Sequence, residues 1–293
     1  MKKFFGDKKA IFVFTFPAIL IFTVMVMWPL FQVVYRSLYK WNGLGSGTFI
    51  GLDNYAKLLN DSVFKISIKN GLIFAIFITI FQLGIGTVLA FAVSNVKVKG
   101  RNFFRIVYFL PVVLSITVVC QLWLSVFNAE FGLLNKFFEI IGLNFHQDWL
   151  SDRNNAIYAI AFVNAWQYMG YHFSLILAGI KSVPADYYEA AQIDGASRFI
   201  SHIKITIPLI AETYKFCLIM SITGGLNAFT NMFIMVGGGP GNSTYTLTYM
   251  MYSSAYRTGK YGYGLAAATS LVLECLIAVL VINRLVAREK TVS

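Results

Sequence analysis

The feature that most constrains this chain is a series of six long apolar runs, each long enough to cross a lipid bilayer. Crossing about 30 Å of hydrocarbon takes about 20 helical residues, and the connections between the runs hold most of the Lys and Arg residues. The runs lie near residues 11–34, 71–94, 106–127, 156–180, 213–236 and 264–284. The sequence therefore predicts an all-α, polytopic membrane protein with six transmembrane helices, in a single domain over residues 1–293.

The composition supports this class and argues against others. Charged side chains are 13% of the 293 residues, about half of the ~25% that soluble domains carry, so a soluble enzyme of this length would lack polar surface. The 27 Phe, 16 Tyr and 5 Trp residues exclude disorder. The net charge of +11 does not indicate nucleic-acid binding, because the basic residues lie in short groups beside the apolar runs rather than on one face.

The distribution of Lys and Arg predicts the orientation. Alternate connections, taken with both ends of the chain, hold 15 of the 24 Lys and Arg residues, whereas the other connections hold 9. Basic residues concentrate on the cytoplasmic side of membrane proteins. Both termini and the connection at about residues 181–211 are therefore expected in the cytoplasm. The first apolar run lacks a small-x-small cleavage site and is expected to stay as an anchor.

Two connections are themselves expected to form helices. Residues 130–143 are apolar at roughly helical spacing but are too short and too charged to cross, which is typical of a helix on the membrane surface. The connection at residues 184–208 has a proline and Asp186 suited to a first helical turn, and Gly195 can adopt the left-handed conformation that ends a helix. A second helix is expected at residues 197–207. From composition alone, an ordinary amphipathic loop is the alternative.

This connection resembles a known motif. Glu189-Ala190-Ala191, then Gly195, then Ile205-Thr206-Ile207-Pro208 are similar to the EAA loop of the membrane-spanning subunits of binding-protein-dependent ABC importers. Its place between the fourth and fifth of six runs also fits that family. Further stretches resemble the carbohydrate-uptake branch in the same order, although Thr230 and Val236 depart from its pattern. These stretches are residues 49–55, Asn70, residues 104–105, 109–111, 132–135, 149–152 and 237–240.

The resemblance implies a transport function and several partners. It implies a permease subunit that translocates a sugar or oligosaccharide, delivered by an extracellular solute-binding protein, in a bacterial or archaeal plasma membrane. It also implies a second, homologous permease subunit and two ATPase subunits. The chain has no phosphate loop of the GxxxxGK[ST] type, so ATP and Mg are expected only in those partners. The residues implied to couple to the ATPases are Glu189, Ala190, Ala191, Asp194, Gly195 and Pro208.

Polar residues inside the spans indicate a possible substrate path, because such residues need hydrogen-bond partners or a water-filled lumen. Amides pair with sugar hydroxyls and aromatic faces stack on pyranose rings. The nominated residues are Asn164, Gln167, Tyr168, Tyr171, Ser221 and Asn227. Interhelical hydrogen bonding is the alternative role for each of them. Glu274, in the middle of the sixth run, is expected to be a protonated structural residue near Ser270, with a role in the lumen or at the partner permease as the alternative.

The turn at residues 237–241 has two possible roles. Gly238, Gly239 and Pro240 form either a contact for the binding protein or simply a flexible hairpin.

A secondary transporter driven by an ion gradient is the main alternative function, and it would show inverted repeats that are not evident here. An integral membrane enzyme or a metal site is disfavoured, because the three histidines lie far apart along the chain.

Overall fold

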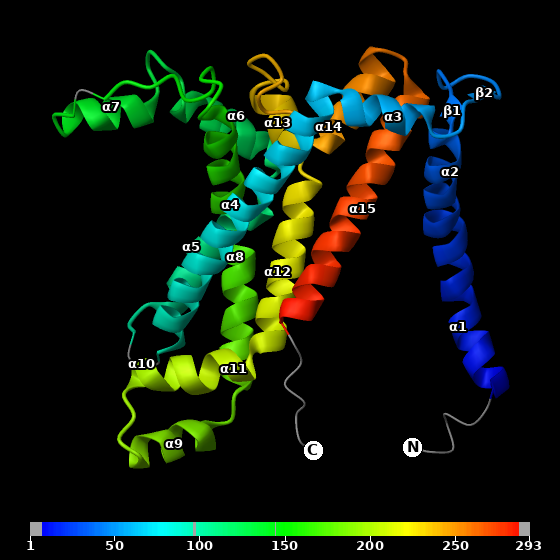
Figure 1. Cartoon of the computed structure of the whole chain (residues 1–293). Helices are drawn as coiled ribbons and strands as arrows, with labels where there is room; N and C mark the ends of the chain where they lie inside the picture. Colours follow the sequence, from blue (N-terminus) through cyan, green and yellow to red (C-terminus); the bar gives the residue numbers. More distant parts are fainter. Residues whose placement is uncertain (1–7, 96–97, 144, 287–293) are drawn as a thin grey trace. The chain divides into compact units, whose positions relative to one another are not determined.

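The computed structural model describes residues 8–95, 98–143 and 145–286, and these are mostly helical (Figure 1). The chain divides into two compact units. Unit 1 comprises residues 1–61 and 250–270, and unit 2 comprises residues 62–249 and 271–293. Five basic residues that support the predicted orientation lie outside the described residues: Lys2, Lys3, Lys97, Arg288 and Lys290.

Unit 1 begins with a continuous apolar helical segment. Helix α1 (Lys8–Phe22) passes through a wide π-helical turn (Thr23–Met27) into α2 (Trp28–Ser37). An antiparallel hairpin of β1 (Tyr39–Lys40) and β2 (Thr48–Phe49) and then α3 (Asp53–Asn60) follow at the same end of α2 (Figure 1). The side chain of Asn54 joins these parts, because its Nδ2 donates to the carbonyls of Ser37 (2.7 Å) and Tyr39 (3.0 Å).

Unit 2 is built around α8, whose surface is covered by other helices. Sixteen of its 27 residues are buried, and it packs most extensively on α4. Glycines allow these close approaches, since a Cβ at Gly86 would lie 3.0 Å from the backbone of Phe173 and one at Gly170 would overlap the carbonyl of Tyr108. The helices up to this point are α4 (Ser62–Ser94), α5 (Arg101–Val113), α6 (Ile116–Val126), α7 (Leu133–Ile140) and α8 (Ala156–Ser182).

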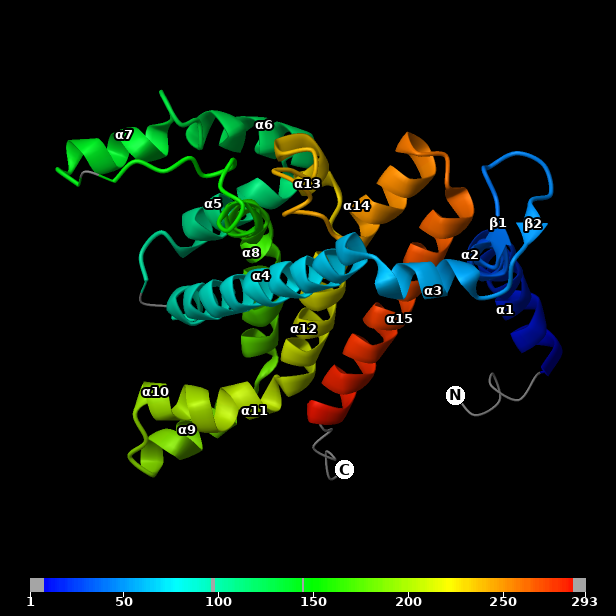
Figure 2. The same ribbon diagram turned by 45° about the horizontal axis from the view of Figure 1, so that its top comes forward.

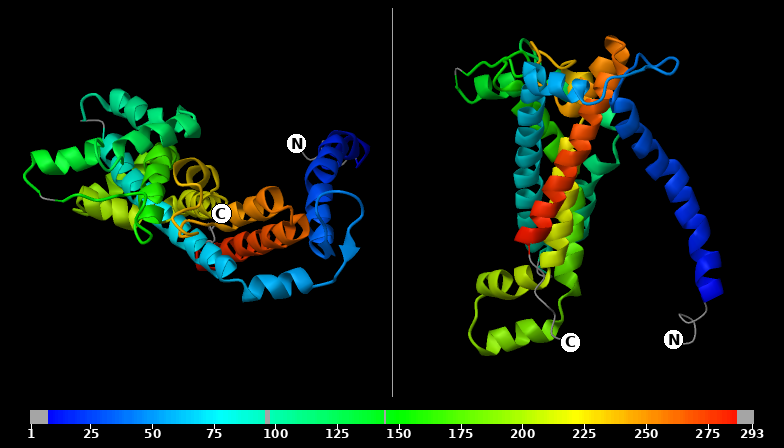
Figure 3. Two further views of the ribbon diagram at one scale, coloured as in Figure 1. Left: turned by 90° about the horizontal axis from the view of Figure 1, so that it is seen from above. Right: turned by 45° about the vertical axis from the view of Figure 1, so that its right-hand side comes forward.

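The later helices of unit 2 lie at both ends of α8 and beside it. Three short helices lie across one end of the long helices (Figures 2 and 3). Helix α10 (Arg198–Ser201) continues in line into α11 (Ile207–Leu209), and α9 (Ala185–Ile193) lies beside them. Helix α12 (Ala211–Leu226) then returns beside α8, and α13 (Thr230–Met235) follows it. The chain crosses into unit 1 within α14 (Leu247–Tyr252), and α15 (Tyr261–Leu285) begins in unit 1 and ends in unit 2.

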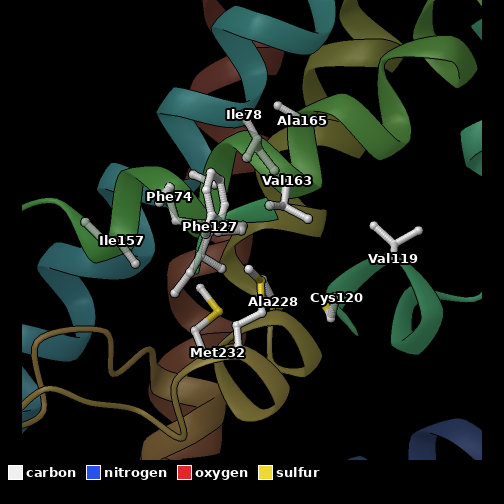
Figure 4. Close-up of a cluster of buried hydrophobic side chains, with 14 of the residues drawn as sticks. Phe74, Ile78, Val119, Cys120, Phe127, Ile157, Val163, Ala165, Ala228 and Met232 are labelled. Carbon is white, nitrogen blue, oxygen red and sulfur yellow. The ribbon is translucent and has the colours of Figure 1, made fainter. Parts of the chain in front are cut away.

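The main apolar core of unit 2 lies where four helices meet. Phe74 and Ile78 come from α4, Cys120 from α6, Val163 from α8 and Met232 from α13, and all are buried (Figure 4). These apolar side chains pack against one another between α8 and its neighbours. Burial of this kind stabilises helix contacts inside a membrane mainly through close packing.

Four helical segments of the described chain are long and apolar enough to cross a membrane. They are Ile11–Ser37, Ser62–Ser94, Ala211–Met235 and Tyr261–Leu285. Each overlaps one of the predicted runs, although the last three begin earlier than expected. The run at residues 156–180 is also helical, as α8, but is less apolar because of its amides and aromatic hydroxyls, and α8 is the most buried helix of unit 2.

The run expected at residues 106–127 is not one straight span. It forms α5 and α6, which meet at an angle of 98°. Leu114 and Ser115 have extended backbone angles that end α5 shortly after Pro111. The carbonyl of Leu114, freed at this bend, accepts a hydrogen bond from Nε2 of Gln167 (3.1 Å).

At a second break, between α12 and α13, a backbone carbonyl also accepts hydrogen bonds from side chains. The carbonyl of Ala228 accepts hydrogen bonds from the hydroxyls of Thr246 (3.0 Å) and Thr248 (2.7 Å). Non-helical backbone at membrane depth is tolerated only where its polar groups find such partners. Both breaks are therefore stabilised by side chains from elsewhere in unit 2.

Candidate functional site

A cavity of about 590 Å³ opens inside unit 2, between the long helices. Five of the six predicted path residues line it: Asn164, Tyr168, Tyr171, Ser221 and Asn227. Asn164, Tyr168 and Tyr171 share one side of α8, as their helical spacing predicts. Ser221 lies on α12, and Asn227 directly follows that helix. The sixth, Gln167, does not line the cavity; its side chain points toward the bend after α5, and the residue is only 1% exposed.

A buried network of hydrogen bonds borders the cavity. Oγ of Ser221 donates to Oε1 of Gln82 (2.8 Å), and Nε2 of Gln82 donates to Oδ1 of Asn164 (3.3 Å). Nδ2 of Asn164 donates to Oδ1 of Asn231 (3.2 Å), and Oγ1 of Thr79 donates to Ser221 (2.9 Å). These five residues join α4, α8, α12 and α13, and none is more than 8% exposed. Asn164 and Ser221 therefore make interhelical bonds as well as lining the cavity.

The two tyrosines differ from the network residues. Tyr168 and Tyr171 are half-buried and line the cavity, and within the described residues their hydroxyls have no hydrogen-bond partner. The ring of Tyr171 meets the ring of His172 edge to face, with centroids 5.7 Å apart. Their hydroxyls are thus available to a ligand, whereas the amide of Asn164 is already engaged.

Two lining residues were missed by the sequence reasoning. Gln82 is the one amide in the predicted run at residues 71–94, and this isolated polar residue in an apolar run was the signal for it. His172 lines the cavity directly after Tyr171, and its Nδ1 is buried without a partner among the described residues. Asn227, by contrast, was predicted, and its Nδ2 donates to the carbonyl of Thr223 (2.9 Å).

The predicted helix–turn–helix at residues 184–208 is present. Pro184 precedes α9, and Gly195 has a φ of +74° at the turn that follows. The amides of Asp194 and Ala196 donate to the carbonyls of Ala190 (3.1 Å) and Ala191 (2.9 Å) and so close the helix. The second predicted helix is also present at residues 198–209, where α10 passes through a π-helical turn (His202–Thr206) into α11, and the helix ends at Ile210, shortly after Pro208.

The two faces of this segment differ. On the inner face, the hydroxyls of Tyr188 and Thr206 lie 2.9 Å apart, and the ring of His202 packs on Phe91 of α4 with centroids 4.5 Å apart. Burial, together with the positive charge of Arg198, holds the pKa of His202 below its ordinary value. Ala191 is buried on this inner face.

The outer face of the same segment is exposed. Glu189, Ala190 and Asp194 are exposed, and so are the large apolar side chains of Ile193 (87%) and Phe199 (73%). An exposed apolar patch beside polar groups is typical of a surface that binds another protein. Three of the six predicted coupling residues therefore lie on a surface suited to docking, and Gly195 sets the turn between its two helices.

The glycine turn after α13 is a packed loop rather than a free hairpin. A Cβ at Gly238 would lie 2.5 Å from the ring of Tyr245 and 2.6 Å from the ring of Tyr249, so only glycine fits there. The hydroxyl of Thr244 donates to the carbonyl of Gly239 (2.9 Å). Gly239 and Pro240 are half-buried. Of the three predicted contact residues, these two retain accessible surface.

Glu274 differs from its predicted surroundings. The hydroxyl of Ser270, expected beside it, donates instead to the carbonyl of Ala266 (3.0 Å). Oε1 of Glu274 is buried and has no hydrogen-bond partner among the described residues. Across those same residues there is no cluster of His, Cys, Asp and Glu that could hold a metal ion.

Comparison with known proteins shows that this chain is similar to ABC transporter permeases. The family model for the binding-protein-dependent transport system inner membrane component matches residues 82–291. The chain is 36% identical to a probable ABC transporter permease protein (YurN) of Bacillus subtilis, over 89% of this chain and 90% of the relative. It is 32% identical to the diacetylchitobiose uptake system permease protein NgcF of Streptomyces coelicolor, over 90% and 79% respectively.

A solved structure matches the fold over almost the whole chain. It is a bacterial alginate ABC transporter in complex with an alginate pentasaccharide-bound periplasmic protein. One of its chains superposes with a TM-score of 0.83 at 22% identity, covering 99% of this chain and 98% of that one. At this level of identity the likeness shows the fold.

Proposed function

Since the chain belongs to the family of binding-protein-dependent transport system inner membrane components and is therefore a multi-pass membrane protein, we propose that it is the sugar-translocating permease subunit of an ATP-driven importer. The observation that carries this proposal is that unit 2 combines a polar cavity between its long helices with an exposed helix–turn–helix at one end of α8. Family membership decides against the secondary transporter that the sequence left open.

The proposed substrate is an oligosaccharide. The cavity offers an exposed amide at Asn227 and the phenol hydroxyls of Tyr168 and Tyr171, which have no hydrogen-bond partner among the described residues. Such groups match the hydroxyls and ring faces of a sugar. Relatives of this chain are named for diacetylchitobiose uptake and for multiple-sugar transport. Asn164 and Ser221 would shape the path mainly by holding the helices in place.

The proposed partners follow from the two faces of unit 2. The exposed residues of α9, with Glu189 as the main polar contact, would dock on an ATPase subunit that holds ATP and Mg, and Pro208 would pass its movement into α12. A second, homologous permease would complete the path. A solute-binding protein would contact the surface that includes Gly239 and Pro240, which is supported by the periplasmic protein in the alginate transporter complex.

We also propose six spans with both termini in the cytoplasm. The bent pair α5–α6 and the buried α8 would add two spans to the four apolar segments. Within unit 2, the end of α8 and the helices α10 and α11 lie toward α9 and away from α7 (Figure 1). The last turn of α8 contains Lys181, and α10 begins at Arg198. This clustering fits the preference of basic residues for the cytoplasmic side, and the exposed apolar side chains of α7 would then rest on the outer surface of the membrane.

Partner identification tests the proposal directly. The tagged chain, purified in mild detergent, should bring down a second permease and ATPase subunits that mass spectrometry identifies. Orientation is tested by single cysteines at Ser197 and Ser151, both exposed; only Ser151→Cys should react with an impermeant maleimide in intact cells. Strong outside labelling of Ser197→Cys would invert the orientation, and recovery of the chain without any ATPase would refute the importer assignment.

A further inference from the structure

Unit 1 contains a second cavity, of about 740 Å³, whose lining is far more polar than that of the first. It lies between the β-hairpin, α3 and the start of α15, and its walls include Lys40, Lys57, Lys260, Asp61, Trp41 and Tyr263. None of these residues belongs to the substrate path or the helix–turn–helix. The cavity is therefore a separate feature that the transport function does not yet explain.

The walls of this cavity are held by specific contacts. The amide of Gly262 donates to the carbonyl of Trp41 (3.0 Å), and a Cβ at Gly262 would overlap the carbonyl of Tyr39, so α15 begins in direct contact with the hairpin. The hydroxyl of Tyr263 donates to Oδ2 of Asp61 (2.6 Å). Asn54 ties α3 to the end of α2. Hydrogen bonds between the surrounding elements therefore hold the walls of this cavity in place.

The charges around the pocket are unbalanced. Residues 36–61 and 250–263 contain five basic and two acidic side chains. Lys57 is paired with Asp53 (2.7 Å), and Asp61 accepts the tyrosine hydrogen bond described above. Within the described residues, the ammonium groups of Lys40 and Lys260 have no ion-pair partner. Two positive charges at one pocket attract an anion.

The position of the pocket in the chain indicates the kind of anion. Lys40 follows the apolar segment that ends at Ser37, and Lys260 directly precedes the segment that begins at Tyr261. Asp61 directly precedes the segment that begins at Ser62. The pocket is therefore formed where membrane segments end, at the depth of the lipid headgroups. Trp and Tyr residues, such as Trp41 and Tyr263, are typical of this depth.

We infer that this pocket binds a phosphate ester between Lys40 and Lys260, and that its position favours the headgroup of an anionic phospholipid as the source. Basic pockets at span ends are suited to lipid phosphates, because each lysine near the surface contributes to the attraction and the phosphate oxygens accept charge-assisted hydrogen bonds. The start of α15 adds the favourable end of its helix dipole. A bound lipid would fasten the hairpin to α15.

The test measures binding by native mass spectrometry on the full chain, purified with its partners in detergent. The probes are dioleoyl phosphatidylglycerol, dioleoylglycerol, which lacks the phosphate, and glycerol 1-phosphate, which lacks the acyl chains. The variants are Lys40→Gln with Lys260→Gln and, as a matched control, Lys65→Gln with Lys136→Gln. Both control lysines are exposed and lie outside the pocket.

We expect phosphatidylglycerol to bind the wild type and the control pair equally, and the Lys40→Gln, Lys260→Gln pair at least about tenfold more weakly. Dioleoylglycerol should not distinguish the variants. Competition by glycerol 1-phosphate at similar concentration would indicate a soluble phosphate ester as the source, and absence of competition a lipid headgroup. Equal phosphatidylglycerol binding by both pairs, or binding of neither phosphate probe to the wild type, would overturn the inference.

Two further measurements separate this result from folding and from transport. The charge-conserving pair Lys40→Arg, Lys260→Arg should retain phosphatidylglycerol, so loss of binding in that pair too would also contradict a charge-based site. Retention of the ATPase subunits on purification reports the fold of unit 2 independently. Because binding is measured without substrate, its failure would leave the proposed sugar transport intact.

Discussion

The cavity of unit 2 and the helix–turn–helix at residues 184–208 use their polar groups in opposite ways. In the cavity, the amides of Gln82, Asn164 and Asn231 are hydrogen-bonded to one another across three helices. In the helix–turn–helix, Glu189 and Asp194 are exposed, and their carboxylates have no hydrogen-bond partner among the described residues. The polar groups of the first region mainly bond to one another, whereas those of the second are exposed.

Because of this difference, substitutions in the cavity network should affect stability, whereas substitutions of exposed or free polar groups should affect function. Removing a network amide leaves buried partners unpaired and costs free energy of folding. Removing an exposed carboxylate or a free phenol hydroxyl leaves the chain's own bonds intact.

Gly195→Val should abolish uptake and uncouple or release the ATPase while the protein remains in the membrane. Gly195 has a φ of +74° and open space around an added Cβ, so valine would act through backbone strain of about 1–3 kcal/mol and through loss of the turn. Sugar uptake and the amount of copurified ATPase are the measurements.

Gly142→Val is the matched control. Gly142 has a φ of +77° and equally open space around an added Cβ, but it follows α7 at the other end of unit 2. The same strain there should leave uptake nearly normal. If both variants lose uptake alike, general strain explains the loss, and the turn at Gly195 has no special coupling role.

Asn164→Ala and Tyr168→Phe should separate stability from transport. Asn164→Ala removes the side-chain partner of Nε2 of Gln82 and of Oδ1 of Asn231, and it should lower the free energy of unfolding by about 1–3 kcal/mol, together with uptake. Tyr168→Phe removes only a free hydroxyl and should weaken sugar transport by about threefold to tenfold, with thermal stability unchanged.

Tyr158→Phe provides the comparison for the tyrosine. Tyr158 lies on the same helix, α8, but outside the cavity, so its substitution should change neither uptake nor stability. Normal uptake by Tyr168→Phe and Tyr171→Phe would mean that these phenols only pack, and the sugar path would have to lie elsewhere.

Glu189→Lys should reduce ATPase association by about tenfold, because it replaces a charge-assisted contact of about 1.5–3 kcal/mol with repulsion. The fraction of permease that retains ATPase on a tag column measures this loss, and reversing a basic residue on the ATPase should restore part of it. Glu139→Lys makes the same change on exposed α7 and should have no effect. Undiminished ATPase binding by Glu189→Lys would remove Glu189 from the interface.

The parts of this structure that depend on local chemistry were predictable from the sequence. The turn at Gly195 needs a residue that tolerates positive φ, and Pro184 and Ser197 suit the starts of α9 and α10, so that segment could be drawn without tertiary information. The helices of most apolar runs followed from length and hydropathy in the same way.

The parts that depend on tertiary partners were not predictable. Asn164 and Gln167 are close in helical angle, but α8 is surrounded on several sides, so one residue meets Gln82 and the cavity while the other meets the bend at Leu114. No local sequence pattern predicts which carbonyl a glutamine side chain will bond. The same holds for Gly238, whose need for glycine arises from the rings of Tyr245 and Tyr249.

The smallest expected effect is the pH dependence of the inner face of the helix–turn–helix. His202 packs on Phe91, and burial and the nearby Arg198 hold its pKa below the ordinary value of 6.5. The folded chain therefore resists protonation more than the unfolded chain does. Stability that is present above about pH 6.5 should fall as the pH is lowered through that value.

Thermal unfolding of the detergent-solubilised protein at pH 7.5 and pH 5.5 measures this effect. His202→Phe retains a ring against Phe91 but cannot titrate, so its midpoint should fall less between the two pH values than that of the wild type. The exposed His146, replaced in the same way, should leave the wild-type fall unchanged. The comparison uses the difference between the two pH values, because loss of the contact between Nδ1 of His202 and the hydroxyl of Thr206 (3.2 Å) lowers the midpoint at both. An equal fall in His202→Phe and wild type would show that protonation of this histidine does not weaken the segment, and the inner face would then be as tolerant of charge as the outer one.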